Sequence, residues 1–106
     1  MTRHILLVHS DPVDNRDDEY NSWYDDVHLP DVLKVPGFVA AKRYVAAAGI
    51  HGEQPSNRFL AIYEIETDDL PAALRALSNA AKGMHLSSAF DRKSQSTFAF
   101  TELIRD

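Results

Sequence analysis

One histidine of the chain, His28, falls on a stripe of aromatic residues. Residues at positions i, i+3, i+4, i+7 and i+8 share one side of a helix. In this chain these positions hold Tyr20, Trp23, Tyr24, Val27 and His28. An imidazole accepts or donates a proton near neutral pH, and aromatic rings around it can line an apolar pocket. We therefore predict His28 as a catalytic group and Tyr20, Trp23 and Tyr24 as substrate-binding residues.

His28 also has a purely structural interpretation. A histidine near the C-terminal end of a helix is stabilised by about 0.3 to 1 kcal/mol through the helix dipole, with no function required. The aromatic residues of the stripe are equally typical of a core. Asp31 lies three residues after His28 and is predicted to orient the imidazole as a second catalytic residue. Capping of a restarted helix explains Asp31 as well.

Three further residues complete the candidate site. His9 ends an apolar strand, and it approaches the pocket only if its face of the strand is the one that the helices cover. Tyr63 shares a strand face with apolar residues, so it is either a core residue or a pocket hydroxyl. Arg43 is able to hold an acidic group of a substrate, or to pair across the sheet with Glu64 or Glu66.

No metal and no organic cofactor is expected. His28 and Asp31 supply two possible metal ligands, whereas catalytic zinc sites usually take three protein ligands. The chain has no cysteine, which excludes disulfides, thiolate ligands and thiol nucleophiles. Its four glycines do not have the spacing of a phosphate-binding loop or a dinucleotide fingerprint.

The elements that position these residues follow the order βαββαβ. The expected strands are residues 4–9, 38–47, 58–66 and 95–103, and the expected helices are residues 15–28 and 67–81. Pro30 disfavours helical geometry at Leu29, so the first helix should kink or break there and restart briefly over residues 31–35. Thr67 or Asp68 is expected to cap the second helix. The order predicts an α+β, ferredoxin-like domain, a four-stranded antiparallel sheet with both helices on one face.

The opposite face of this sheet has no cover within one chain. Simple alternation in the second strand places Val39, Ala41 and Val45 on one side and Phe38, Ala40 and Tyr44 on the other. The first and third strands are also apolar on both sides. We expect a second copy of the chain to cover this face, so that two sheets pack as a barrel in a homodimer.

Length and charge restrict the function further. A chain of 106 residues corresponds to a single domain, 1–106. Its formal net charge of -5 argues against a nucleic-acid partner. The apolar run at residues 5–8 is too short for a membrane span, and the absence of cysteine favours a cytoplasmic location.

The stretch that carries His28 resembles a known family. Its residues are Trp23, Tyr24, His28, Leu29, Pro30, Asp31, Val32 and Leu33, followed by Pro36, Gly37 and Phe38. Together with the element order, they resemble the dimeric α/β-barrel superfamily and, within it, the EthD-like proteins. The resemblance implies a dimer and a pocket between the helices and the sheet. Relatives include cofactor-free monooxygenases, muconolactone isomerases and haem-containing enzymes, so it implies no single reaction, and haem stays an option.

Two functions are therefore open. The first is a small cytoplasmic enzyme that acts without an organic cofactor on an apolar aromatic or lactone-type metabolite, with His28 as the proton-transfer group. A monooxygenase, an isomerase and a dehydratase all fit this hypothesis. The second is a binding or stress-associated homodimer without catalysis, in which side chains fill the space between helices and sheet. A cavity that reaches His28 would favour the first.

Overall fold

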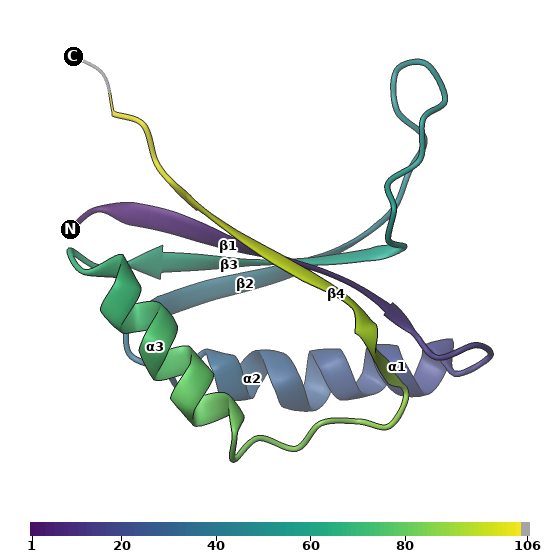
Figure 1. The fold of residues 1–106 in the computed structure, drawn as a ribbon, viewed down its shortest axis with the longest axis horizontal. Coiled ribbons are helices and arrows are strands. Elements are labelled where there is room, and N and C mark those ends of the chain that lie inside the picture. Colours follow the sequence, from purple (N-terminus) through teal and green to yellow (C-terminus); the bar gives the residue numbers. More distant parts are fainter. Residues whose placement is uncertain (105–106) are drawn as a thin grey trace.

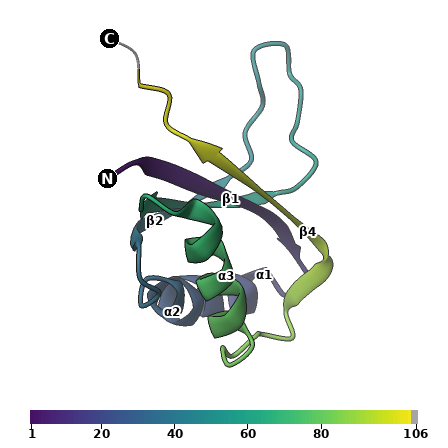
Figure 2. The ribbon, with the colours of Figure 1, turned by 60° about the vertical axis from the view of Figure 1, so that its left-hand side comes forward.

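The chain forms one four-stranded antiparallel sheet with its helices on a single face (Figures 1 and 2). The computed structural model describes residues 1–104. The elements are β1 (Arg3–Pro12), α1 (Asp17–Trp23), η1 (Tyr24–His28), α2 (Leu29–Val32), β2 (Phe38–Val45), β3 (Phe59–Glu66), α3 (Leu70–Ala81) and β4 (Phe90–Thr101). The strand order is β2-β3-β1-β4. The predicted ferredoxin-like α+β architecture is thus confirmed.

The first helical segment runs without a break from α1 through η1 to α2. The expected break at Leu29 is wrong, because Leu29 has helical dihedral angles, with φ -57° and ψ -48°. Instead, the turn before Pro30 widens to a π-helix, in which the Leu29 N–H donates to the Tyr24 carbonyl five residues back. The wider turn accommodates Pro30, whose ring would otherwise crowd the carbonyl four residues earlier. No helix in the described part of the chain has the length and apolar character needed to cross a membrane.

The helix α3 and the strand β4 begin at residues other than those predicted from the sequence. Asp69, and not Thr67 or Asp68, caps α3, and its carboxylate accepts a hydrogen bond of 3.1 Å from the Ala72 N–H. The strand β4 begins at Phe90 instead of residue 95, since Phe90 and Asp91 pair with the end of β1 beyond an irregularity in the ladder. The earlier start of β4 comes from a contact with a strand that is distant in the sequence.

A bulge at Val39 changes the faces of β2. Phe38 pairs with Ile65 and Ala40 with Glu64, so one extra residue lies between them. Because side chains alternate along a strand, the extra residue turns Phe38 to the helix side, together with Ala41 and against the predicted alternation. Phe38 is 4% exposed there and belongs to the core.

The two faces of the sheet differ in their cover. The core lies on the helix side and consists of Leu6, Val8, Tyr20, Trp23, Tyr24, Val32, Val35, Phe38, Ala61, Tyr63, Ile65, Ala73, Ala89 and Phe90. Within the described residues, no helix lies on the opposite face (Figure 2). Phe98 and Phe100 on that face are 55% and 56% exposed. One chain alone therefore leaves an apolar sheet surface open.

Candidate functional site

A cavity of about 240 Å³ lies between the helices and the sheet, beside His28. Its apolar walls are Leu6, Val8, Val32, Leu77, Ala81, Met84, Leu86 and Phe90, and its polar residues are His28, Tyr63, Arg92, Gln95 and Thr97. These residues come from both helical segments, from β1, β3 and β4, and from the loop between α3 and β4. The fold thus brings distant parts of the sequence together around one histidine.

Two side chains that line this cavity each carry a buried polar atom without a partner. The Nδ1 atom of His28 and the hydroxyl oxygen of Tyr63 form no hydrogen bond with any described residue. A buried polar group without a partner costs about 1 to 3 kcal/mol, and native proteins rarely contain one. Both side chains line the same cavity. A ligand that supplies the missing hydrogen bonds would remove this cost.

The surroundings of His28 keep its imidazole neutral. The ring stacks on the indole of Trp23, with centroids 4.7 Å apart, and meets the edge of Tyr24 at 5.2 Å. Burial lowers the pKa of His28, and the carboxylate of Asp31 opposes this shift in part. A neutral imidazole at physiological pH is able to accept a proton.

The π-helical turn accounts for the stack between Trp23 and His28. These residues are five positions apart, and in an α-helix of about 3.6 residues per turn they would point roughly 140° away from each other. The wider turn of η1 returns His28 to the side of Trp23. Trp23 itself is fixed by a hydrogen bond of 2.9 Å from its indole N–H to the His85 carbonyl. π-Helical turns are frequently found at functional sites.

The aromatic residues Tyr20, Trp23 and Tyr24 do not line the cavity. They form a packed layer beside His28 instead of the predicted pocket wall. Tyr20 is fully buried, and its hydroxyl forms a hydrogen bond of 2.5 Å with the Ser10 hydroxyl. Burial raises the pKa of Tyr24 to about 12. This layer supports the site without contacting a ligand in the cavity, because its polar groups are turned to protein partners or sealed in the core.

Arg43 lies on the far side of this aromatic layer. Its guanidinium group is 4.4 Å from the centroid of the Tyr24 ring, and it donates hydrogen bonds to Asp25 at 3.0 Å and Asn21 at 2.9 Å. It pairs with neither Glu64 nor Glu66. Arg43 is absent from the lining of the His28 cavity, so the structure separates it from the predicted pocket.

Asp31 and His9 also lie outside the cavity lining. Asp31 pairs with Lys34 at 3.5 Å, and it acts on His28 only through its charge. His9 is on the open face of the sheet, where its ring meets the edge of Phe98 at 6.1 Å. His9 would have a role in the pocket only if it lay on the helix side of the sheet, and it does not. Of the predicted residues, the structure brings only His28 and Tyr63 together at the cavity.

Sequence reasoning missed the contribution of β4 and of the preceding loop. Arg92, Gln95 and Thr97 line the cavity from β4, and Met84 and Leu86 line it from the loop. Thr97 alternates with Phe98 in the sequence, and this alternation indicates that the two side chains lie on opposite faces of the strand. Nothing in the sequence pattern marks Arg92. The described residues contain no group of three or more histidine, aspartate or glutamate side chains suited to a metal ion.

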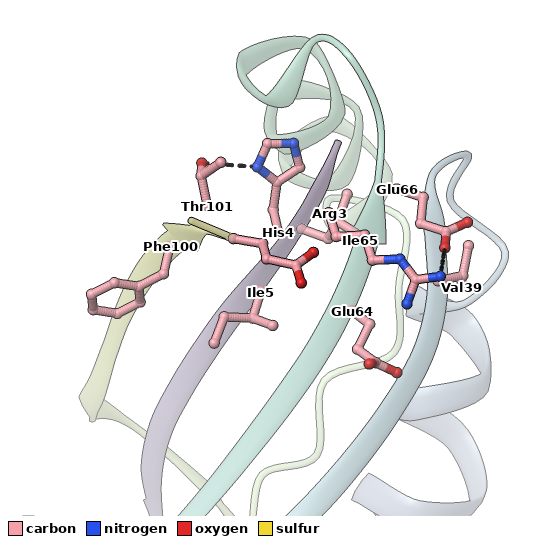
Figure 3. Close-up of a pocket in the computed structure, with 10 residues that line it drawn as sticks. Arg3, His4, Ile5, Val39, Glu64, Ile65, Glu66, Phe100 and Thr101 are labelled. Atoms are coloured by element: carbon pink, nitrogen blue, oxygen red, sulfur yellow. Dashed lines mark hydrogen bonds and ion pairs between the residues drawn. The ribbon is translucent and has the colours of Figure 1, made fainter. Parts of the chain in front are cut away.

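A larger depression of about 400 Å³ lies on the open sheet face, near the start of β1 (Figure 3). Ile5, Val39 and Phe100 provide its apolar part, and Arg3 pairs there with Glu66 at 3.4 Å. His4 adjoins it and is buried. Its ring nitrogens form hydrogen bonds with the Thr101 hydroxyl and the Thr67 carbonyl. The buried polar atoms without partners lie elsewhere. The site beside His28 is therefore the stronger candidate.

Comparison with known proteins defines the fold only. No family model matches the chain, and no curated protein matches it. A solved EthD-family protein from Bacillus halodurans has a TM-score of 0.63 and 17% identity, over 97% of this chain and 100% of that one. An EthD-like protein from Ralstonia eutropha has a TM-score of 0.56 and 14% identity, over 100% and 96%. The resemblance to EthD-like proteins is confirmed at the level of fold.

A third solved structure corrects the expectation about cofactors. The haem-degrading protein MhuD from Mycobacterium tuberculosis, which has two haems bound in its active site, matches with a TM-score of 0.59 and 16% identity, over 97% of this chain and 98% of that one. Because this fold holds haem in another protein, the expectation that no organic cofactor takes part is contradicted.

The cavity beside His28 can be compared with the space and the ligand that a haem group needs. Haem iron is commonly held by a histidine, and His28 is the histidine at the cavity. However, a cavity of about 240 Å³ is smaller than the roughly 300 to 1,000 Å³ of pockets for drug-sized ligands, and a porphyrin is no smaller than such a ligand. The cavity does not fit a porphyrin, so we derive the chemistry from the side chains that line it.

Proposed function

We propose that the protein is an enzyme that moves a proton on a small apolar metabolite of aromatic or lactone type, with His28 as the proton-transfer group. The observation that carries this proposal is the pair of buried polar atoms, His28 Nδ1 and the Tyr63 hydroxyl, which lack partners beside one cavity. Apolar walls with a few convergent polar groups are the usual lining of a small-molecule site.

The two groups are suited to different parts of one reaction. The lowered pKa of His28 keeps the imidazole neutral and ready to accept a proton from the substrate. Burial raises the pKa of Tyr63, so its phenol stays protonated and is able to donate a hydrogen bond to a substrate oxygen. Removal of a proton next to a carbonyl group uses both, since negative charge develops on the oxygen. Isomerisation and dehydration contain this step.

The proposal includes a homodimer formed through the open sheet face. Ile5, Val39 and Phe100 on this face are seen in Figure 3. Phe98 and Tyr44, which lie on the same face, are half-exposed. Lys42 and Glu64 are charged side chains of this face, on the neighbouring strands β2 and β3. In a symmetric dimer, each can approach the opposite charge of the second copy. We further propose that residues 1–106 act as one domain in the cytoplasm, in line with the absence of cysteine.

A substrate screen with two variants tests the enzymatic role. Small aromatic and lactone compounds would be incubated with the protein in deuterated water, and deuterium uptake at carbon would be followed by mass spectrometry. His28→Gln should lower the rate about 100-fold or more, as expected for loss of a general base, and Tyr63→Phe should lower it to a smaller extent. His51→Gln, in an exposed loop, is the matched control and should react like the wild type.

Equal rates in the wild type and in His28→Gln would reject the catalytic role. Binding of a compound without any exchange or product would support the second hypothesis, a binding protein without catalysis. The indole of Trp23, stacked on His28, provides a fluorescence signal for binding that does not depend on turnover.

A further inference from the structure

Arg92 is the charged side chain at the mouth of the His28 cavity. No acidic side chain from residues 1–104 lines this cavity, although the whole chain has 16 acidic against 11 basic residues. Arg92 itself is exposed on β4, where Gln95 and Thr97 complete a polar rim. The cavity therefore opens next to a single positive charge in a protein of negative net charge.

The guanidinium group of Arg92 has no ion-pair partner among residues 1–104. The described arginines that pair with a carboxylate are Arg3, Arg16, Arg43 and Arg58. Arg92 forms no ion pair within the described part of the chain. Arg75 is also unpaired there, but it lies on the exposed side of α3 and not at the cavity. Arg92 is thus a free cation placed at a cavity, and Arg75 is a free cation placed at open surface.

A bulge in β4 fixes the position of this rim. The ladder between β1 and β4 is regular up to the pair His9 and Ser96, and it resumes at Asp11 and Asp91. Residues 92–95 therefore face a single residue of β1. Such bulges re-aim side chains and are over-represented beside active sites.

Hydrogen bonds hold the bulge in place. The Ser94 hydroxyl accepts a hydrogen bond of 2.8 Å from the Asp11 N–H and donates one of 2.6 Å to the Asp91 carbonyl. The Asn57 side chain donates to the Ser94 carbonyl at 3.0 Å and to the Asp11 carboxylate at 2.9 Å. These hydrogen bonds therefore fix the conformation of the segment that carries Arg92 and Gln95.

We propose that the ligand of this cavity is a small monoanionic acid, whose carboxylate pairs with Arg92 while its apolar body enters toward His28 and Tyr63. This inference rests on the proposed function and names its substrate class. A guanidinium group matches a carboxylate with two parallel hydrogen bonds. The apolar walls suit an unsaturated or aromatic body, and the small volume excludes a drug-sized one. The unpartnered atoms of His28 and Tyr63 call for a carbonyl or hydroxyl group at the far end.

A matched pair of probes tests the charge preference by binding alone. 4-Hydroxyphenylacetate and its neutral amide have nearly the same shape, and both would be titrated into the full-length protein with calorimetry and Trp23 fluorescence. The acid should bind about tenfold tighter or more than the amide, as expected for a charge-assisted hydrogen bond. Arg92→Gln should abolish this difference, whereas Arg75→Gln should preserve it.

Equal affinity of the wild type for the two probes would overturn the inference, and so would a preference that persists in Arg92→Gln. Failure of both probes to bind at millimolar concentration would overturn it as well. Circular dichroism shows whether each variant is folded. Because no turnover is measured, an acid preference that depends on Arg92 supports the inference even if His28→Gln proves to react like the wild type, a result that would reject the proposed function alone.

Discussion

The imidazole of His28 lies stacked on the indole of Trp23, with ring centroids 4.7 Å apart and ring planes inclined by 26°. Trp23 is the only tryptophan of the chain, so its fluorescence reports on this one contact. A protonated imidazole quenches indole emission more strongly than a neutral one. Because burial lowers the pKa of His28, the emission should fall with a midpoint below the usual histidine value of about 6.5.

His28→Gln is the control for this titration and should remove the transition from the fluorescence curve. Far-UV circular dichroism at each pH separates protonation from unfolding. A midpoint at or above about 6.5 in the folded protein would contradict the desolvated position of the imidazole.

The stability of the protein should depend on pH through the same histidine. The folded pKa of His28 is lowered, so the unfolded chain binds more protons in the range between the folded and the unfolded values. The free energy of unfolding should therefore be highest above about pH 6.5 and should fall as the pH drops below that value. Urea unfolding at several pH values measures this slope, and His28→Gln should flatten it. An identical slope in both proteins would contradict the assignment.

Two tyrosine hydroxyls should respond differently to removal. Tyr63 is 2% exposed and its hydroxyl has no partner among the described residues, so Tyr63→Phe should leave the stability unchanged or raise it by up to about 1 kcal/mol. Tyr20 bonds the buried Ser10 hydroxyl, so Tyr20→Phe leaves that group unpaired and should cost about 1 to 3 kcal/mol. Chemical denaturation of both variants provides the comparison. A larger loss for Tyr63→Phe than for Tyr20→Phe would show that the Tyr63 hydroxyl is satisfied.

Arg43 should contribute to stability and not to the cavity. Its guanidinium group packs over the Tyr24 ring and donates to Asp25 and Asn21, and its side chain is 11% exposed. Arg43→Gln should lower the free energy of unfolding by about 1.5 to 3 kcal/mol, the range for hydrogen bonds to charged groups. The exposed Arg75→Gln should change it by less than about 0.5 kcal/mol. A strong loss of ligand affinity in a folded Arg43→Gln protein would place Arg43 in the site.

The open sheet face should set the oligomeric state. Phe98→Glu introduces a charge among the apolar side chains of this face, on the edge strand β4, and should convert a dimer into monomers in sedimentation experiments. Ile50→Glu is the control, because Ile50 is 94% exposed in the loop between β2 and β3, away from the sheet. A wild type that sediments with the mass of one chain would contradict the dimer.

Local patterns in the sequence were sufficient for the architecture. Runs such as residues 58–66 alternate clearly, and Pro36 and Gly37 separate helix from strand, so the order of elements and the ferredoxin-like fold could be predicted. The bulges could not, because an extra residue in one strand is decided by its partner strand. The sequence pattern therefore placed Phe38 on the wrong face, and it did not predict Arg92 as a residue of the site.

The site was only half predictable for a related reason. A helical stripe identifies the residues that face inward, but it does not distinguish a hydroxyl that finds a partner from one that does not. Tyr20 and Tyr63 look alike in the sequence, and only the position of Ser10 separates them. His4 and His9 likewise lie on the same strand, yet one is buried with both nitrogens bonded and the other lies on the open face.

The widened turn over Tyr24–His28 holds one residue more than an α-helical turn would need. Deleting a single codon between Trp23 and His28 would restore the ordinary winding and place His28 four positions after Trp23, a spacing at which two helix residues still share one side. Descendants of such a gene can therefore lose or regain the extra residue in one mutational step and still keep His28 beside Trp23 on an unchanged scaffold.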